Sequence, residues 1–536
     1  MHWWQTGVIY QIYPRSFQDT NGDGVGDLAG IAARLPYLAD LGVDAIWLSP
    51  IFVSPMADFG YDIADHCAVD PLFGTLADFD ALLARAHALG LKVILDLVPN
   101  HTSNRHAWFA ESRVSRQSAK RDWYIWRNGA PEGGPPNNWL SEFGGSAWQY
   151  DAASDQYYYH AFLREQPDLN WRNRQVREAM HDVMRFWLDR GVDGFRVDVM
   201  WHLIKDEDFR DNPPNPDFAD GDQPYRRLLP LYSTDRPEVH VVIRELRAVV
   251  DEYPERVLIG EIYLPVEKLA AYYGDNLSGA HLPFNFALIE TPWRADQVGC
   301  LIDRYEAALP PGAWPNWVLG NHDRPRIASR VGGGQGRVAA MLLLALPGTP
   351  FLYYGDEIGM AQVPIPPSQT RDPWEINLPG LGLGRDGCRT PMQWDGSRWA
   401  GFSDAEPWLP LPADSDRFNV ESAEADPLSL LALYRQLLAL RRARPALSDG
   451  AYRPVAQTGN LLAFERHTDR ERVLVALNFG ADVEKYVLKS DAYCGTILLA
   501  TGLDRAGEGV CGQLILRPHE ALIILLESAS RTREAS

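Results

Sequence analysis

The chain has 536 residues, more than one ordinary compact domain, so we expect a large domain with additions. It contains 51 Lys and Arg against 71 Asp and Glu, a formal net charge of -20. Such a charge repels nucleic-acid phosphates and anionic membrane surfaces, so we expect neither as a partner. No segment approaches the roughly 20 uninterrupted apolar residues of a membrane span.

Five cysteines are scattered through the chain, and none form pairs at a spacing typical of a metal site. They predict neither a disulfide framework nor a zinc site, and they are typical of a reducing compartment. A strand-like run at residues 8–13 begins almost at the N-terminus, without a basic segment and an apolar segment before it. We therefore expect no signal peptide and a cytoplasmic location.

Short apolar segments of strand length alternate with helical patterns along most of the chain. Eight segments are predicted to be strands: residues 8–13, 43–48, 91–97, 192–198, 257–262, 280–284, 316–319 and 351–354. Most connections can hold a helix, as the patterns at 31–41, 76–89 and 175–190 indicate. Eight such units predict an α/β fold, the (β/α)₈ TIM barrel. A doubly wound sheet is the competing architecture, but no glycine-rich phosphate loop follows the first strand.

Two long connections and a change of pattern predict additional domains. Residues 102–171 are rich in Trp, Gly, Asn and Pro and exceed an ordinary loop, so we expect an inserted subdomain after the third strand. Residues 357–425 form a second long connection after the eighth strand. Beyond a helical pattern at 428–442, the residues alternate as in strands. The predicted domains are the barrel at 1–101 and 172–447, the inserted subdomain at 102–171, and an all-β C-terminal sandwich at 448–536.

Acidic residues stand at the ends of three predicted barrel strands, where barrel active sites are built. In the fourth strand, the two-residue period places Arg196 and Asp198 on the same face. A neighbouring arginine lowers the pKa of an Asp and keeps it ionised, as a nucleophile requires. A structural ion pair is the alternative interpretation of this strand taken alone.

The fifth and seventh strands lead to two further acids. Glu261 follows four apolar residues, and an apolar setting raises the pKa of a Glu, as a general acid requires. Asp323 stands beside His322 after the seventh strand. Each acid alone fits a capping or ion-pair role, but three acids at three strand ends favour a catalytic group. Two carboxyl groups about 5 Å apart are the apparatus of a retaining glycosidase.

The segments around these acids resemble the motifs of the α-amylase superfamily (glycoside hydrolase family 13), and within it the oligo-1,6-glucosidase and α-glucosidase branch. The matching segments are DLVPNH at 96–101, GFRVD at 194–198, GE at 260–261, NHD at 321–323, QPDLN at 166–170, YQIYPRSF at 10–17 and RTPMQW at 389–394. They occur in the family's order and cover essentially the whole chain. The resemblance implies an enzyme that acts on small glucosides of the maltose, isomaltose, trehalose or sucrose type.

The resemblance also implies a role for each matching residue. Asp198 would be the nucleophile, Glu261 the acid/base, and Asp323 the third acid, which binds ring hydroxyls as the transition state forms. The implied substrate-binding residues are Tyr61 under the glucose ring, His101 and His322 at its hydroxyls, Arg196 orienting Asp198, Asp62 and Arg389 closing the pocket, and Phe143 and Phe162 at its mouth. A closed pocket implies exo cleavage of single glucose units, and this chemistry requires no organic cofactor.

Val199, the residue after the implied nucleophile, bears on linkage preference. In this branch a Val here resembles enzymes that accept α-1,6 bonds, whereas Thr or Ala resembles maltose-preferring enzymes. A Thr hydroxyl can hydrogen-bond the second sugar of an α-1,4 link, whereas Val presents only methyl groups. The alternative is that Val199 only packs the strand end and the inserted subdomain selects the linkage.

The segment 19–27 has the spacing of a calcium loop, with oxygen-bearing side chains at alternate positions and Gly at the sixth. The candidate ligands are Asp19, Asn21, Asp23, Asp27 and the backbone carbonyl of Val25. Position twelve is Gly30 instead of Glu, which excludes a complete EF-hand. Enzymes of the oligo-1,6-glucosidase type carry a similar loop with a structural cation, so we expect Ca²⁺ here. The alternative is an Asp- and Gly-rich turn without a metal.

Three functions remain open at this point. The first is hydrolysis, with transglucosylation at high sugar concentration. The second is a transferase or isomerase of the same superfamily, of the trehalose synthase or sucrose isomerase type, which uses the same catalytic residues. The third is a non-catalytic barrel of the transporter heavy-chain kind, which is disfavoured because all three acids are present.

Overall fold

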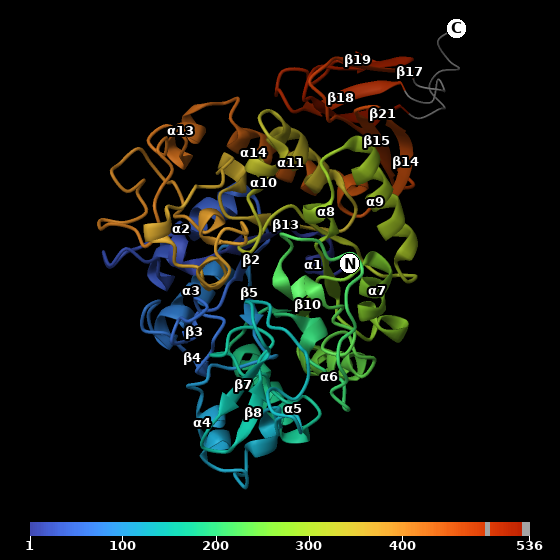
Figure 1. The fold of residues 1–536 in the computed structure, drawn as a ribbon. Helices are drawn as coiled ribbons and strands as arrows, with labels where there is room; N and C mark the ends of the chain where they lie inside the picture. Colours follow the sequence, from blue (N-terminus) through green and yellow to red (C-terminus); the bar gives the residue numbers. More distant parts are fainter. Residues whose placement is uncertain (488–493, 528–536) are drawn as a thin grey trace.

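The structure is a computed structural model that describes residues 1–487 and 494–527. Its centre is an eight-stranded parallel sheet (Figure 1). The strands are β1 (Ile9–Ile12), β2 (Ala45–Leu48), β5 (Lys92–Leu97), β9 (Gly194–Val197), β10 (Val257–Ile262), β11 (Leu282–Asn285), β12 (Asn316–Val318) and β13 (Thr349–Tyr353). Each overlaps one of the eight segments predicted from the sequence, and the predicted (β/α)₈ barrel is confirmed.

The sheet closes on itself through a side chain. Its order is β11-β10-β9-β5-β2-β1-β13-β12, so β11 and β12 are the two end strands. The Asn316 side-chain amide donates to the carbonyl of Pro283 at 2.7 Å, and its Oδ1 accepts from the backbone N–H of Asn285 at 2.9 Å. Asn316 is fully buried, and this pair of hydrogen bonds satisfies backbone groups that a sheet edge would otherwise leave open.

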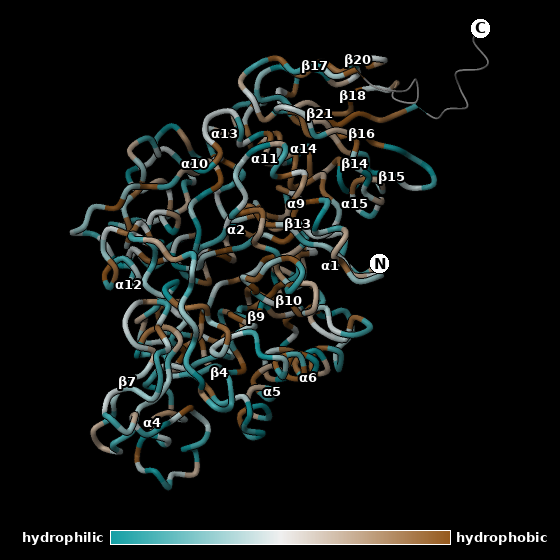
Figure 2. Tube along the Cα trace, turned by 45° about the vertical axis from the view of Figure 1, so that its right-hand side comes forward, coloured by the Kyte–Doolittle hydropathy of each residue, from teal (hydrophilic) through white to brown (hydrophobic). Residues whose placement is uncertain are grey.

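Helices follow the barrel strands in turn. The principal ones are α2 (Leu28–Leu41), α3 (Leu76–Ala88), α5 (Arg174–Asp189), α6 (Val239–Asp251), α7 (Val266–Ala270), α9 (Ala295–Ala308), α11 (Gln335–Ala345) and α14 (Leu430–Ala443). Hydrophobic segments gather around the barrel, while hydrophilic ones lie mostly in the outer loops (Figure 2). Helix α2 begins before the pattern predicted at 31–41, because the Asp27 side chain caps it by accepting from the Gly30 N–H at 2.6 Å.

The long connection after β5 contains a small sheet of its own. Its elements are α4 (Ala107–Val114), β6 (Trp126–Arg127), β7 (Trp148–Asp151) and β8 (Gln156–Tyr159). The three strands pair in the order β6-β8-β7 around a buried aromatic cluster that includes Trp139, Trp148 and Tyr159. In Figure 1 this region lies at the opposite end of the molecule from the C-terminal strands. The predicted limits of this subdomain, 102 and 171, stay predictions.

Shorter elements complete the barrel region. They are α1 (Trp3–Thr6), β3 (Phe52–Val53), β4 (Asp65–Val69), α8 (Ala287–Glu290), α10 (Ile327–Val331), α12 (Pro373–Asn377), α13 (Val420–Ala425) and α15 (Pro445–Ser448). Two of the 3-10 helices bear on the site, η3 (Met200–His202) and η4 (Pro224–Arg227). Both lie in the connection between β9 and α6. This connection is a third long loop beside the barrel, which the sequence analysis did not single out.

The C-terminal region consists of antiparallel strands, as predicted. They are β14 (Ala451–Thr458), β15 (Leu461–His467), β16 (Arg472–Asn478), β17 (Glu484–Val487), β18 (Gly495–Ala500), β19 (Gly509–Val510), β20 (Gln513–Leu516) and β21 (Ala521–Leu526). A six-stranded sheet, β14-β15-β16-β21-β18-β19, faces the pair β17-β20. Leu514 and Leu516 of β20 pack in one buried cluster with Leu474 and Ile524 of the larger sheet.

One pair of cysteines departs from the sequence-based prediction. Cys494 and Cys511 form a disulfide, whereas we expected no disulfide framework. The two residues are 17 positions apart, and this spacing does not by itself predict a disulfide. The pairing of β18 with β19 brings them together, because Gly495 lies opposite Val510. Cys67, Cys300 and Cys388 have free thiols.

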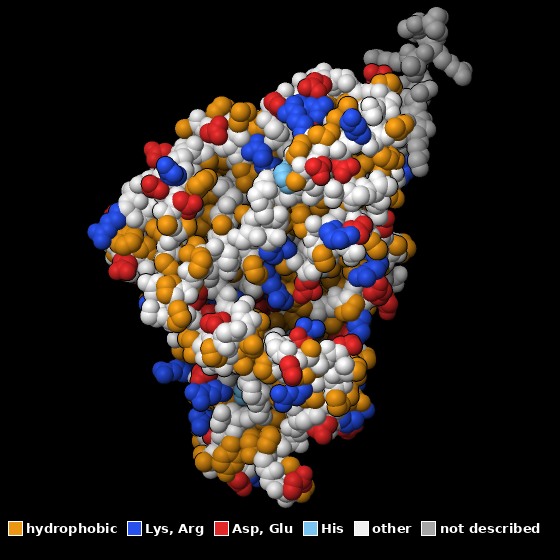
Figure 3. Space-filling view, turned by 45° about the horizontal axis from the view of Figure 1, so that its top comes forward, with side chains coloured by type: hydrophobic (Ala, Val, Ile, Leu, Met, Phe, Trp, Pro, Cys, Tyr) orange, Lys and Arg blue, Asp and Glu red, His pale blue; other side chains and the backbone are white. Residues whose placement is uncertain are grey.

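Two general properties bear on possible partners. Within residues 1–487 and 494–527, no helix is long and apolar enough to cross a membrane. On the face drawn in Figure 3, acidic and basic side chains are interspersed, and no broad basic patch is visible. That face therefore lacks the electrostatic footprint of a nucleic-acid-binding surface.

Candidate active site

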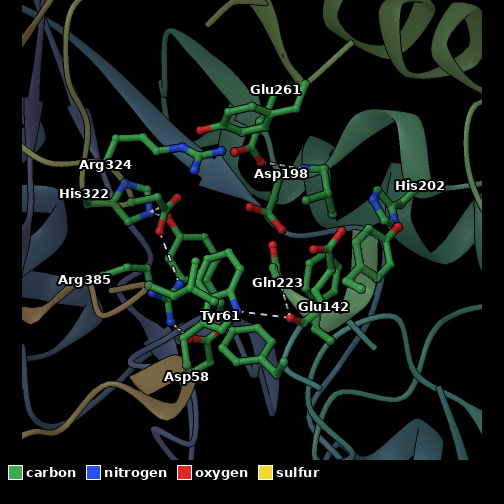
Figure 4. Close-up of a pocket in the computed structure, with 18 of the residues that line it drawn as sticks. Asp58, Tyr61, Glu142, Asp198, His202, Gln223, Glu261, His322, Arg324 and Arg385 are labelled. Atoms are coloured by element: carbon green, nitrogen blue, oxygen red, sulfur yellow. Dashed lines mark hydrogen bonds and ion pairs between the residues drawn. The ribbon is translucent and has the colours of Figure 1, made fainter. Parts of the chain in front are cut away.

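The three predicted catalytic acids converge on one cavity of about 450 Å³. Asp198 directly follows β9, Glu261 lies near the end of β10, and Asp323 lies in the segment after β12. The strands are parallel, so their carboxyl ends meet at one end of the barrel. Asp198 and Glu261 are buried, and the side chain of Asp323 is 20% exposed. Figure 4 shows Asp198 and Glu261 pointing into this space.

Arg196 links the catalytic carboxylates. Its Nη1 lies 2.8 Å from Asp198 Oδ1 and 2.7 Å from Asp96 Oδ1, and its Nη2 lies 2.8 Å from Glu261 Oε2. The strand register explains this cluster, because Arg196 of β9 lies opposite Asp96 of β5 and Ile259 of β10. The guanidinium is fully buried and planar, which suits it to hold several carboxylates at once.

The pKa of Asp198 moves in the direction opposite to our prediction. We expected Arg196 to lower it, but burial, reinforced by the charge of Glu261, raises the pKa of Asp198 well above its ordinary value. Burial also raises the pKa of Glu261, against the attraction of Arg196. Because the two carboxyls interact, they titrate as a pair, and the second proton is harder to remove than the first. A pair that holds one proton supplies one carboxylate and one acid.

Asp323 has the opposite electrostatic setting. Its Oδ1 lies 2.9 Å from Arg389 Nη2 and 3.2 Å from Arg385 Nη1, and its Oδ2 lies 3.3 Å from His322 Nε2. Burial alone would raise the pKa of Asp323, but His322 and the two arginines outweigh it and hold the pKa far below the usual range. Asp323 is therefore an ionised acceptor on the cavity wall.

The predicted sugar-binding aromatic and imidazole groups lie beside these acids. Tyr61 stacks on His322 with ring centroids 5.3 Å apart, and its hydroxyl lies 2.6 Å from His322 Nε2 and 3.0 Å from Asp96 Oδ2. His101 Nε2 lies 3.1 Å from the carbonyl of Tyr61. Burial lowers the pKa of His101 to about 4. Tyr61, His101 and His322 all line the cavity.

Asp62 does not lie at the pocket floor, so this part of the prediction is wrong. Its fully buried carboxylate accepts hydrogen bonds from the Ser54 hydroxyl at 2.9 Å and from the backbone N–H groups of Ala57 and Asp58 at 3.0 and 2.9 Å. It therefore holds a turn. Asp58, four residues earlier, lines the cavity instead. The two acids flank Tyr61, and the sequence does not indicate which one faces inward.

Arg389 is close to the site but lies behind its wall. It contacts Asp323 and donates from Nε to the carbonyl of His322 at 2.7 Å, and it is not among the residues that line the cavity. Arg385 lines it and lies 2.7 Å from Asp58 Oδ1 and 2.8 Å from Asp372 Oδ1. The pair that closes this end of the cavity is thus Asp58 and Arg385 (Figure 4).

The inserted region supplies aromatic walls, as predicted. Phe143 and Phe162 both line the cavity, with ring centroids 6.4 Å apart in an edge arrangement. Phe143 also packs at 5.2 Å against Trp374, which comes from the connection after β13. Two long insertions thus meet over the catalytic acids.

Several residues of the cavity escaped the sequence analysis. They are Asp58, Glu142, Trp201, His202, Gln223, Tyr225, Arg226, Tyr263, Arg324, Trp374 and Arg385. Most belong to loops that are far apart in the sequence and meet only in the fold. His202 lies four residues beyond Asp198, and this closeness is the sequence feature that could have indicated it.

The candidate metal loop folds as a series of tight turns. Asp19 accepts from the backbone N–H groups of Asn21, Gly22 and Gly24, while Asp23 accepts from that of Val25. None of the ion pairs of the described residues involves Asp19, Asp23 or Asp27. Three unneutralised carboxylates in one short loop suit a hard cation with oxygen ligands.

The ligand set of such a cation would extend beyond acidic side chains. Within the described ranges, no three His, Cys, Asp or Glu side chains cluster closely enough to hold a metal. The Asn21 amide and the Val25 carbonyl would therefore complete the set. The Asp27 side chain caps α2 and accepts from the Thr20 N–H at 2.8 Å, which leaves it less free to bind an ion than we expected.

Comparisons with known proteins agree with this geometry. The family model "Alpha amylase, catalytic domain" matches residues 11–450. The chain is 47% identical to the "Probable alpha-glucosidase" of Rhizobium meliloti (strain 1021), over 89% of each protein. It is 38% identical to the oligo-1,6-glucosidase of Halalkalibacterium halodurans, over 98% of this chain and 99% of that protein. The crystal structure of the α-glucosyl transfer enzyme XgtA matches with a TM-score of 0.93 and 42% identity, over 98% of this chain and 100% of that one.

Proposed function

The chain belongs to the α-amylase family, glycoside hydrolase family 13, and we propose that this glycoside hydrolase is a retaining, exo-acting α-glucosidase. The observation that carries the proposal is the contact of one buried guanidinium, that of Arg196, with both Asp198 and Glu261. The cavity that holds them is closed at one end by Asp58 and Arg385. Its substrates would be disaccharides and short oligosaccharides with a terminal α-linked glucose.

The reaction divides into two steps. In the first, Asp198 attacks the anomeric carbon while protonated Glu261 gives its proton to the glycosidic oxygen, so the carbon–oxygen bond to the leaving sugar breaks as the glucosyl-Asp198 ester forms. In the second, Glu261 takes a proton from water, and the water oxygen attacks the same carbon and releases Asp198. Ionised Asp323 would accept hydrogen bonds from the glucose hydroxyls, and these bonds strengthen as positive charge develops on the ring.

Exo cleavage follows from the closed end of the cavity. Asp58 and Arg385 are 5% and 6% exposed and joined to each other, so a chain cannot continue past them. Soluble starch should then be a poor substrate beside a disaccharide. Measuring iodine staining against glucose release tests this point, and a rapid loss of staining with little glucose would contradict a closed pocket.

Transfer is the second candidate, favoured by the 42% identity to an α-glucosyl transfer enzyme. A sugar hydroxyl that replaces water in the second step converts hydrolysis into transglucosylation without a new catalytic group. Incubation with maltose, isomaltose, trehalose or sucrose, each followed for glucose and for new oligosaccharides, separates the two. Glucose as the main product supports hydrolysis, and a new disaccharide or trisaccharide as the main product supports the transfer or isomerase alternative.

Two further parts of the account stand as proposals. Acceptance of α-1,6 bonds is supported by the apolar side chain of Val199 at the cavity wall. A structural Ca²⁺ in the loop 19–27 is supported by its three carboxylates, which form no ion pair within the described residues, and would hold the first βα connection, with no part in bond cleavage. The cytoplasmic location stays a prediction.

A further inference from the structure

A second cavity, of about 790 Å³, lies behind the aromatic wall of the active site. Phe143 and Phe162 line both cavities, so their rings form a partition between the two spaces. The second cavity, which we call the groove, is formed mainly by residues 141–165 of the inserted region and residues 371–378 of the connection after β13. The three catalytic acids line the first cavity and not the groove. The groove is therefore separate from the space in which the glycosidic bond is cleaved.

The groove has the size and the lining of a small-molecule site. Such sites measure roughly 300–1,000 Å³ and combine apolar walls with a few polar groups. Phe162, Pro373 and Leu378 are half-buried and supply apolar walls. The two insertions approach each other closely at Gly144, where a Cβ atom would lie 2.9 Å from Cδ2 of Leu378. The groove thus lies between packed segments of the fold.

His160 presents to the groove a hydrogen-bond acceptor without a partner. Its side chain lines the groove, although the residue is only 5% exposed. Nδ1 lies 2.9 Å from the carbonyl of Phe162, and since a carbonyl only accepts, Nδ1 carries the hydrogen. Burial lowers the pKa of His160, so the ring is neutral and Nε2 carries no hydrogen. Nε2 makes no hydrogen bond within the described residues, and such an acceptor beside a cavity indicates a ligand that donates to it.

The other polar groups of the lining favour a neutral ligand over an anion. The side chains of Arg371 and Asn377 form no hydrogen bond or ion pair within the described part of the chain. Arg164 also lines the groove, but Glu165 neutralises it at 2.9 Å. An ionised carboxylate would pair with Arg371 but, as a pure acceptor, could not satisfy His160. A hydroxyl group both donates and accepts, so a polyhydroxylated ligand can satisfy all of these groups.

We propose that the groove is a second, non-catalytic binding site for a neutral sugar. Nε2 of His160 would accept from one ring hydroxyl, Arg371 and Asn377 would bind others, and the C–H face of the ring would pack on Phe162 and Leu378. That the sugar is glucose or a short glucoside rests on the proposed α-glucosidase function, because such an enzyme meets these sugars at high concentration. The preference for a polyhydroxylated ligand does not depend on that function.

The test follows glucose binding to the intact enzyme by NMR of methyl groups, because each cavity contains its own reporters. Val199 lines the active-site cavity, whereas Ile376 and Leu378 line the groove. Glucose is a product of the proposed reaction, so both sites can be titrated in one experiment without net turnover. We expect the methyl signals of Ile376 and Leu378 to shift and to reach saturation as glucose is added.

Two substitutions of His160 separate the roles of its ring nitrogens. Asparagine places its amide where Nδ1 lies and can keep the bond to the Phe162 carbonyl, which also accepts from the Ser141 hydroxyl. Glutamine places its amide where Nε2 lies and returns an acceptor to the groove. His160→Asn should weaken glucose binding in the groove on the order of tenfold while the titration of Val199 persists. His160→Gln should bind glucose in the groove more tightly than His160→Asn does.

A second variant and a control guard against effects on folding. Asn377→Trp, at an exposed position, should fill the groove and remove the glucose-dependent shift of Leu378. The matched control is His240→Asn, because His240 packs on Tyr272 and lines neither cavity. It should leave both titrations unchanged.

The outcomes distinguish the groove from the proposed function. An enzyme that cleaves maltose but shows no saturable shift of Ile376 and Leu378, or the same shift in His160→Asn as in the wild type, would overturn the inference alone. Shifts of these methyl groups with inorganic phosphate but not with glucose would overturn the neutral-sugar ligand. Saturable glucose binding in the groove of a protein that cleaves no α-glucoside would support the inference and overturn the proposed function.

Discussion

The backbone N–H of Val199 donates a 2.8 Å hydrogen bond to Oε2 of Glu261. The residue after one catalytic carboxylate thereby positions the other. Val199 adopts a left-handed conformation, with φ 38° and ψ 48°, which is rare for a β-branched residue. Such local strain persists where the surrounding structure enforces it, and here it turns the N–H toward β10 while the side chain lines the cavity.

Val199 should therefore influence linkage preference through its side chain. Val199→Thr keeps the β-branched shape and adds a hydroxyl that can fix the second sugar of an α-1,4 link. We expect the ratio of kcat/KM on isomaltose to that on maltose to fall, by an amount equivalent to about 1–3 kcal/mol. Steady-state kinetics of the wild type and of Val199→Thr on isomaltose and maltose measure this ratio. An unchanged ratio would mean that Val199 only packs the strand end and that the insertion selects the linkage.

Asp58 and Asp62 should respond differently to the same change. Asp58→Asn removes the charge that pairs with Arg385 at the closed end, so kcat/KM on maltose should fall by on the order of tenfold or more with little loss of stability. Asp62→Asn weakens a buried turn that uses three hydrogen bonds, so it should lower the free energy of unfolding by roughly 1–3 kcal/mol. Activity assays with thermal melts distinguish them. A loss of activity in Asp62→Asn with a loss of stability in Asp58→Asn would instead support the original prediction that Asp62 closes the pocket.

The loop 19–27 should bind one divalent cation. A chelator should lower the melting temperature of the wild-type protein, and added Ca²⁺ should restore it, because binding to the folded state alone stabilises that state. Asp23→Ala should have a lower melting temperature and no further response to the chelator. Equal melting curves with and without chelator, together with no retained metal in elemental analysis, would rule the site out.

Asp356 should make stability depend on pH. Burial raises the pKa of this carboxyl to about 7, against the attraction of Arg326, whereas an Asp in an unfolded chain titrates near 3.9. Between these values the folded state holds a proton that the unfolded state has lost. Stability from this group is thus complete below pH about 4 and declines as pH rises toward 7, by roughly 1.4 kcal/mol per unit.

The variant Asp356→Asn tests this effect, because the amide at this position takes up no proton in this pH range. Urea unfolding at several pH values should show a shallower decline between pH 4 and 7 in the variant than in the wild type. Parallel curves would show that Asp356 is ionised in the folded protein.

The sequence predicted the barrel well because its strands are short apolar runs and three of them lead to the acids Asp198, Glu261 and Asp323. Runs such as 257–262 are buried on both faces, and this burial produces a continuous apolar pattern. The Cys494–Cys511 bridge was missed because it depends on the register of β18 and β19. Register between strands separated by a loop is a property of the fold and leaves no spacing rule in the chain.

The candidate site was predictable only where a strand or motif carried it. Asp198, Glu261 and Asp323 were found from their strand ends, and Phe143 and Phe162 from the insertion. His202 and Glu142 were missed, because neither belongs to a periodic segment and their proximity to the acids arises from loop packing. The predicted direction of the pKa shift of Asp198 was wrong. The sequence shows the neighbouring Arg196, which lowers this pKa, but it does not show the burial and the nearby Glu261, which together raise it further.

The central claim is that Asp198 and Glu261 cleave an α-glucoside with retention of configuration. The most direct test follows p-nitrophenyl α-glucoside by ¹H NMR in the first minutes of reaction, with Asp198→Asn and Glu261→Gln as inactive references. This substrate releases glucose as its only sugar, so the first anomer seen comes from the cleaved bond. The account predicts α-glucose first, with β-glucose appearing later by mutarotation, and little or no glucose from either variant. β-Glucose as the first product, or near-normal turnover by Asp198→Asn, would contradict it.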